Sequence, residues 1–75
     1  MTLDELETGR CATITAIHGE GQIAQRLMAM GLLEGSEVSV IRRALGGDPI
    51  EIEIMDYSLS LRLGEARRIQ IEPKP

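Results

Sequence analysis

The stretch from residue 50 to residue 54 constrains the fold of this chain more than any other. Its sequence, IEIEI, alternates isoleucine and glutamate. Successive side chains of a strand point to opposite faces of a sheet. The pattern therefore predicts a strand with one apolar face in a core and one charged face in water.

The size of the chain limits the core that this strand can join. The 75 residues contain no Phe or Trp and only one Tyr, so the core has to be aliphatic. A domain this small buries only about 60% of the surface that its unfolded chain exposes. Because small-molecule active sites are usually deep cavities, such a core leaves little room for one. We expect a single domain over residues 1–75, with residues 73–75 as a flexible tail, and no enzymatic activity.

Four further stretches are typical of short strands. Residues 10–17, 37–43, 59–63 and 69–71 contain alternating or β-branched apolar residues separated by turn signals. Asp56-Tyr57 is expected to turn the chain after the IEIEI strand, and residues 64–66 to form a short helical turn. The pattern predicts an all-β fold, a small five-stranded barrel. A flat meander is the competing architecture, but closing the sheet protects its edges better.

Two short helical segments interrupt the strands. Thr2 and Glu5 have the spacing of a capping box, which predicts one helical turn at the N-terminus. Ile23, Leu27 and Met30 recur at helical spacing, with Ala24 and Met28 beside them on the predicted inner face. The outer face then carries Gln22, Gln25, Arg26 and Ala29.

The end of this helix is marked by glycine. Gly31 stands where a left-handed residue ends a helix, and Leu32 is placed to pack back on Leu27, as in a Schellman motif. Glu34-Gly35 suits a type II turn, because Gly35 would occupy the position with positive φ.

Charge and cysteine content exclude several classes of protein. The net charge is −4 and the sequence pI is about 4.8, with no basic cluster and no aromatic platform for nucleic acid. Arg42-Arg43 and Arg67-Arg68 are interpreted as solvated strand ends. Cys11 is alone, which favours a reducing compartment and predicts a cytoplasmic protein. No apolar run is long enough for membrane insertion.

The residues that could carry chemistry are few. Cys11 and His18 are the one potential nucleophile–base pair, but a strand between them would separate them by roughly 20 Å. The best candidates for metal ligands are His18 with Glu20, and the Glu51/Glu53 pair on one strand face. A transition-metal site needs three or four converging ligands, which this pattern does not supply. We therefore expect no required cofactor.

A partner-binding surface is the remaining possibility. We expect partner contacts from Gln25 and Arg26 on the helix and from Arg42 and Leu45 near the loop of residues 44–49. Asp48 and Pro49 are expected to set the shape of that loop. An apolar residue at a loop tip can anchor a partner. The alternative, that Leu45 folds back onto the rim of the barrel, stays open.

Several motifs together resemble the ferrous-iron transport protein A (FeoA) family. The match extends over nearly the whole chain, and the chain departs from the family pattern at Glu34, where Pro is common, and at Leu45-Gly46, which replaces a more usual Pro-Leu. The motifs that carry the resemblance are RLMAMGL (26–32), GDPIEI (47–52) and YSLSLR (57–62).

This resemblance implies a small cytoplasmic SH3-like barrel with an accessory or regulatory role in bacterial ferrous-iron uptake. The implied partner is the membrane iron transporter that carries a cytoplasmic GTP-binding domain. The alternative function is direct binding of Fe²⁺ or another divalent metal ion, as a sensor. A module that reads proline-rich peptides is the weakest hypothesis, because such grooves are lined with aromatic residues. Self-association of the barrel stays open.

Overall fold

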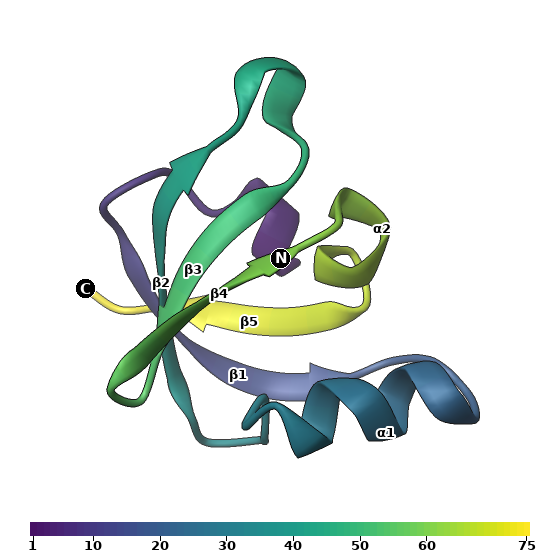
Figure 1. The fold of residues 1–75 in the computed structure, drawn as a ribbon. Coiled ribbons are helices and arrows are strands. Elements are labelled where there is room, and N and C mark those ends of the chain that lie inside the picture. The colour runs from purple at the N-terminus through teal and green to yellow at the C-terminus, as the bar shows by residue number, and fades with distance from the viewer.

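Five antiparallel strands form one bent sheet in the computed structural model, which describes residues 1–75 (Figure 1). The strand order is β4-β3-β2-β1-β5. The elements in chain order are the 3₁₀ turn η1 (Leu3–Glu5), β1 (Cys11–Ile17), α1 (Gln22–Ala29), β2 (Glu37–Arg43), the 3₁₀ turn η2 (Leu45–Gly47), β3 (Ile50–Ile54), β4 (Tyr57–Leu61), α2 (Leu63–Ala66) and β5 (Ile69–Pro73).

The order of the strands rules out the flat meander. β1 lies between β2 and β5, so the last strand returns to pair with the first. Register shifts between Val40 and Arg42 and between Ile14 and Ala16 interrupt the ladders. Such bulges bend strands and increase their twist. The sheet therefore curls around one core, as predicted for a small barrel.

The core is aliphatic, as the composition predicts. No buried residue is polar, and Ile50, Ile52 and Ile54 of β3 are at most 1% exposed. The strand predicted from the IEIEI pattern is thus confirmed with its faces assigned correctly. The core cluster consists of Leu3, Leu6, Ala12, Ile14, Leu27, Leu32, Val38, Val40, Ile50, Ile52, Ile54, Leu61, Ala66, Ile69 and Ile71.

The Schellman ending of α1 is also confirmed. Gly31 has φ of +97°, its N–H donates to the carbonyl of Met28 at 3.0 Å, and the N–H of Leu32 donates to the carbonyl of Leu27 at 3.1 Å. Both leucines are fully buried. The turn at Gly35 has the expected positive φ, and the Ser36 N–H closes it on Leu33.

The inner face of α1 is narrower than predicted. Leu27 is the buried residue of this helix, and Met30, which follows the helix, packs partly against the core. Ile23 is 38% exposed and Met28 is 46% exposed, so the prediction that they face inward is wrong. The helix covers too little of the sheet to bury a wider stripe.

Two boundaries also differ from the prediction. The turn after β3 consists of Met55 and Asp56, because Ile54 pairs with Tyr57 and Tyr57 already begins β4. At the C-terminus, Pro73 is the last residue of β5, and the N–H of Lys74 donates to the Cys11 carbonyl at 3.0 Å. The expected tail is therefore shorter than residues 73–75.

Gly31 provides a test of how α1 is attached. A Cβ at this residue would lie 2.9 Å from the Tyr57 hydroxyl, whereas a Cβ at Gly35 meets nothing within 4 Å, and both residues have positive φ. Positive φ alone costs a residue with a Cβ about 1–2 kcal/mol. We expect Gly31→Ala to lower the free energy of unfolding by more than Gly35→Ala does, measured by urea denaturation. Equal losses would show that the contact with Tyr57 contributes nothing.

Candidate partner-binding site

The loop between β2 and β3 holds one leucine fully in solvent. Its backbone is closed by two hydrogen bonds, from the Ala44 N–H to the Pro49 carbonyl at 3.0 Å and from the Gly47 N–H to the Ala44 carbonyl at 2.7 Å. Leu45 begins the 3₁₀ turn inside this loop and is completely exposed. Of the two alternatives for Leu45, the structure therefore shows an exposed loop residue and not one folded onto the rim.

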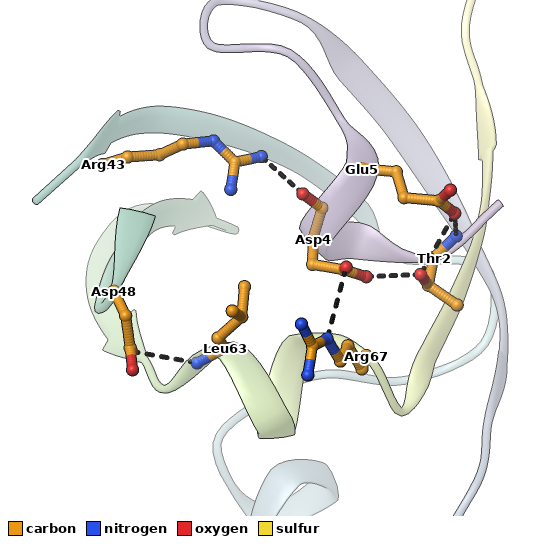
Figure 2. Close-up of polar contacts among 7 residues, drawn as sticks. All are labelled: Thr2, Asp4, Glu5, Arg43, Asp48, Leu63 and Arg67. Atoms are coloured by element: carbon orange, nitrogen blue, oxygen red, sulfur yellow. Dashed lines mark hydrogen bonds and ion pairs between the residues drawn. The ribbon is translucent and has the colours of Figure 1, made fainter. Parts of the chain in front are cut away.

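Asp48 fixes this loop against the start of α2. Its Oδ1 accepts a hydrogen bond from the Leu63 N–H at 3.0 Å, shown in Figure 2, and its Oδ2 pairs with the Arg62 guanidinium at 3.1 Å. The first N–H groups of a helix have no partner within the helix, so a carboxylate at this position stabilises the helix start. Pro49 follows through a cis peptide bond.

Arg43 makes a tertiary contact that the sequence did not reveal. From the end of β2 its guanidinium donates to the backbone carbonyl of Asp4 at 2.8 Å (Figure 2). It also donates to the backbone carbonyl of Leu6 at 2.6 Å. The Asp4 carboxylate in turn lies 3.7 Å from Arg67. The prediction that these arginines are merely solvated strand ends is wrong for Arg43, whereas Arg67 stays largely exposed beside Asp4. No local sequence signal could have found a partner so distant in the chain.

The predicted contact residues do not form one surface. Figure 1 shows the loop between β2 and β3 at the top of the molecule and α1 at the bottom. Gln25 is exposed on α1, whereas Arg26 pairs with Glu65 of α2 at 2.7 Å. Arg42 pairs with Glu51 across the β2–β3 ladder. All three charged residues of the predicted set, Arg26, Arg42 and Asp48, thus have partners within the chain.

The hairpin after β3 adds exposed apolar side chains close to the end of α1. Met55 has φ of +56° and is 71% exposed, and the Tyr57 hydroxyl donates to the Met30 carbonyl. A β-carbon at Gly31 would lie 3.4 Å from the Met55 sulfur, so this hairpin touches the end of the helix. Neither residue has a sequence signal of a contact surface, since a methionine in a turn carries no distinctive pattern.

The metal-ligand candidates lie on the surface. His18 directly follows β1, and both His18 and Glu20 are exposed in the loop before α1. No group of three or more His, Cys, Asp or Glu side chains in the chain could hold a metal ion. Cys11 begins β1 and His18 follows its other end, so they cannot form a nucleophile–base pair.

A groove of about 340 Å³ opens on the outer face of β1, β2 and β3. The register places Cys11 opposite Ser39 and Ser39 opposite Glu53 across these strands. Nearby, Glu37 pairs with Lys74 at 2.8 Å, and this hydrogen bond and charge raise the pKa of Lys74. The groove is open and lined by both polar and apolar side chains, which suits a surface contact better than enclosure of a small molecule.

Taken together, the fold and the exposed loop define a small, mainly β domain of the SH3-like type with a fixed loop that carries a solvent-exposed leucine. The FeoA domain model matches residues 1–73. The chain belongs to the FeoA family, which confirms the resemblance seen in the sequence.

Named relatives agree with this assignment. The chain is 39% identical over 72 residues to the Fe(2+) transport protein A/Fe(2+) transporter FeoB fusion protein of Porphyromonas gingivalis; the match covers 96% of this chain and 8% of that protein. The FeoA-like protein from Clostridium acetobutylicum has a TM-score of 0.90 and 34% identity, over 97% of this chain and 85% of that one. The Stenotrophomonas maltophilia FeoA complexed with zinc, a prokaryotic SH3 domain protein, has a TM-score of 0.85 and 30% identity, over 96% and 89%.

The chain thus spans less than a tenth of the fusion protein and most of the two structural relatives. None of its helices has the length and apolar character needed to cross a membrane.

The contacts of Asp48 can be separated by three variants. Asp48→Ala removes both the helix-start acceptor and the ion pair, and we expect it to lower the free energy of unfolding by about 1 kcal/mol. Asp48→Asn keeps an oxygen acceptor for the Leu63 N–H and should cost less. Arg62→Ala removes only an exposed ion pair, with an expected loss below about 1 kcal/mol. Chemical denaturation measures all three, and an Asp48→Ala protein as stable as the wild type would contradict the role of the cap.

Proposed function

We propose that this protein is an accessory factor of bacterial ferrous-iron uptake that docks on the cytoplasmic GTP-binding domain of the membrane iron transporter. The observation that carries the proposal is the fusion of a matching domain to the transporter FeoB in Porphyromonas gingivalis. Fusion holds two domains at high effective concentration without any new contact. A contact between such a domain and the transporter needs a surface on the domain that can be buried against the transporter.

Leu45 is the residue we assign to the centre of that contact. It buries none of its side chain, although burying a leucine is worth about 1.5–3 kcal/mol. The loop is already fixed by its own hydrogen bonds and by Asp48, so docking would order little additional backbone. An exposed apolar side chain on an ordered loop is the arrangement expected of an anchor that fills a pocket on a partner.

The test compares two exposed leucines at opposite ends of β2. Leu45 follows this strand and Leu33, which is 49% exposed, precedes it. We expect Leu45→Ser to weaken binding to the full-length transporter in nanodiscs at least about tenfold, because truncating an anchor residue typically costs more than 1 kcal/mol. Leu33→Ser should leave the dissociation constant unchanged.

If only Leu33→Ser lost affinity, the docking surface would lie at the end of the molecule near α1. Binding that is unchanged in both variants would exclude both leucines. A transporter without its GTP-binding domain, tested beside the complete one, decides which part of the transporter is contacted.

Binding of a divalent metal ion is the second candidate function, since the Stenotrophomonas maltophilia relative was solved in complex with zinc. In this chain the ligands would be His18 and Glu20, both exposed, with the remaining positions filled by water or by the partner. Calorimetric titration with Zn²⁺, and with Fe²⁺ under anaerobic conditions, tests it. Saturable binding that disappears in His18→Ala is the expected result, and no saturable heat at sub-millimolar metal would remove the candidate.

A further inference from the structure

The outer edge of β4 has backbone groups with no partner. β4 pairs with β3 on one side and with no strand on the other. Residues that flank a two-residue hairpin turn form a hydrogen-bonded pair. Along an antiparallel ladder, hydrogen-bonded pairs alternate with non-hydrogen-bonded pairs, whose N–H and C=O groups point away from the partner strand. The N–H and C=O groups of Ser58 and Ser60 therefore point away from the sheet, and no hydrogen bond outside the ladder uses either amide. In the ladder between β3 and β4, the hydrogen-bonded pairs are therefore Ile54–Tyr57, Ile52–Leu59 and Ile50–Leu61.

The other edge of the sheet is protected, and β4 is not. The Ile71 N–H of β5 donates to the Met1 carbonyl at 2.8 Å, and Thr2 forms a bridge with Gln70, so the N-terminal segment covers part of this edge. β5 also ends with a charge and a proline, Glu72-Pro73. Proteins usually block edge strands with such charges, prolines, bulges or covering segments. The sequence of β4, YSLSL, contains no charge and no proline, and its ladder with β3 has no bulge.

We propose that the β4 edge pairs with the β4 edge of a second copy of this chain, antiparallel and about a two-fold axis at Leu59. In this register Ser58 of one copy faces Ser60 of the other, and the two residues exchange both backbone hydrogen bonds. The symmetry repeats the pair on the other side of the axis. A two-fold interface has to be self-complementary. The β4 edge meets this requirement, because it carries no charge and the outward N–H and C=O groups of Ser58 face those of Ser60 in the second copy.

The charges that flank β4 select this register. Asp56 precedes the strand and Arg62 follows it, so each Asp56 lies opposite the Arg62 of the other copy when Leu59 is at the axis. Asp56 forms no ion pair within the chain. Arg62 already contacts Asp48, but its side chain is 69% exposed and a guanidinium has five N–H donors. A shift by two residues keeps the backbone pattern but places Asp56 opposite Ser60 in one direction, or Arg62 opposite Ser58 in the other, and the opposite charges no longer meet.

The side chains add an apolar contact at the axis. Leu59 shares the face of Ile52, its partner in β3, yet it is only half-buried. Against a second copy it would lie beside the other Leu59 in a non-hydrogen-bonded pair, the closer of the two antiparallel pair types. The interface is short, so we expect a weak dimer with a dissociation constant on the order of 10⁻⁴ M.

Two measurements on the wild-type chain, sedimentation and amide exchange, test the proposal without any variant. We expect the sedimentation-derived mass to rise toward that of a dimer as the protein concentration increases into the millimolar range. In NMR exchange experiments over the same range, the Ser58 and Ser60 amides should become protected. A chain that stays monomeric throughout, or a dimer in which both amides exchange freely, overturns the proposal.

Three variants then test the geometry. Ser60→Pro removes an N–H that makes no bond in the monomer, and by symmetry it removes one from each copy. We expect it to weaken the dimer at least about tenfold, while Ser60→Ala, which keeps the amide, leaves it unchanged. Asp56→Lys places like charges opposite each other and should weaken the dimer about three- to tenfold at low salt and less at high salt.

The matched control for the charge change is Glu7→Lys, which lies outside the strand and should have no effect. Dimerisation that survives Ser60→Pro would overturn the proposal. So would protection of the Ser58 and Ser60 amides only after the transporter is added, because the edge would then belong to the partner. Neither result depends on Leu45, so failure here is separable from failure of the docking proposal.

Discussion

The pairing of β3 with both of its neighbours is the constraint on which the rest of this structure depends. β3 lies between β2 and β4 and contributes three fully buried isoleucines, while its two glutamates face outward. A slip of one residue would turn Glu51 and Glu53 into the core, so the register is fixed by the cost of burying charge. That register determines what stands at each end of the strand: the loop with Leu45 and Asp48 at one end, and the hairpin turn of Met55 and Asp56 at the other.

The helix α1 depends on the sheet much more weakly. It buries Leu27 but leaves Ile23 and Met28 largely exposed, so its packing area is small. Its further attachments are polar and lie near its C-terminal end: the Arg26–Glu65 ion pair and the hydrogen bond from Tyr57 to the Met30 carbonyl. Because the Arg26 side chain of this ion pair is 60% exposed, solvent screens the pair and its contribution is small. The Schellman ending and the buried Leu32 therefore hold the helix in place more than its sides do.

The parts of the fold that the sequence predicted are those governed by local rules. The IEIEI alternation, the glycine after α1 and the turn at Gly35 each follow from backbone geometry or from a period of two, and all are present. The errors fall where a tertiary contact decides, or where a residue without a turn signal forms the turn. The inward face of α1 was overestimated because the sheet available to cover it is small. The hairpin turn was misplaced by one residue because a methionine, not a glycine or asparagine, adopts the positive φ.

The candidate site was predictable only in part, for the same reason. Leu45 stood out as an apolar residue that no strand required, and the structure leaves it in solvent. The internal partners of Arg26, Arg42 and Asp48 depend on which elements the sheet brings together, and no residue pattern contains that information. Likewise, the separation of α1 from the β2–β3 loop follows from the direction of β2. The free edge of β4 also became visible only with the strand order.

The two surfaces proposed for this protein meet at Arg62. This residue pairs with Asp48, which fixes the loop of Leu45, and it also ends the edge strand, opposite Asp56 of a second copy in the proposed dimer. A guanidinium can bind two carboxylates, so dimerisation need not release the loop. If it does shift the Arg62–Asp48 pair, however, edge pairing and loop docking are coupled, and each must change the affinity of the other by the same factor. In a chain with so few elements, one arginine is enough to link two contacts that lie on different parts of the sheet.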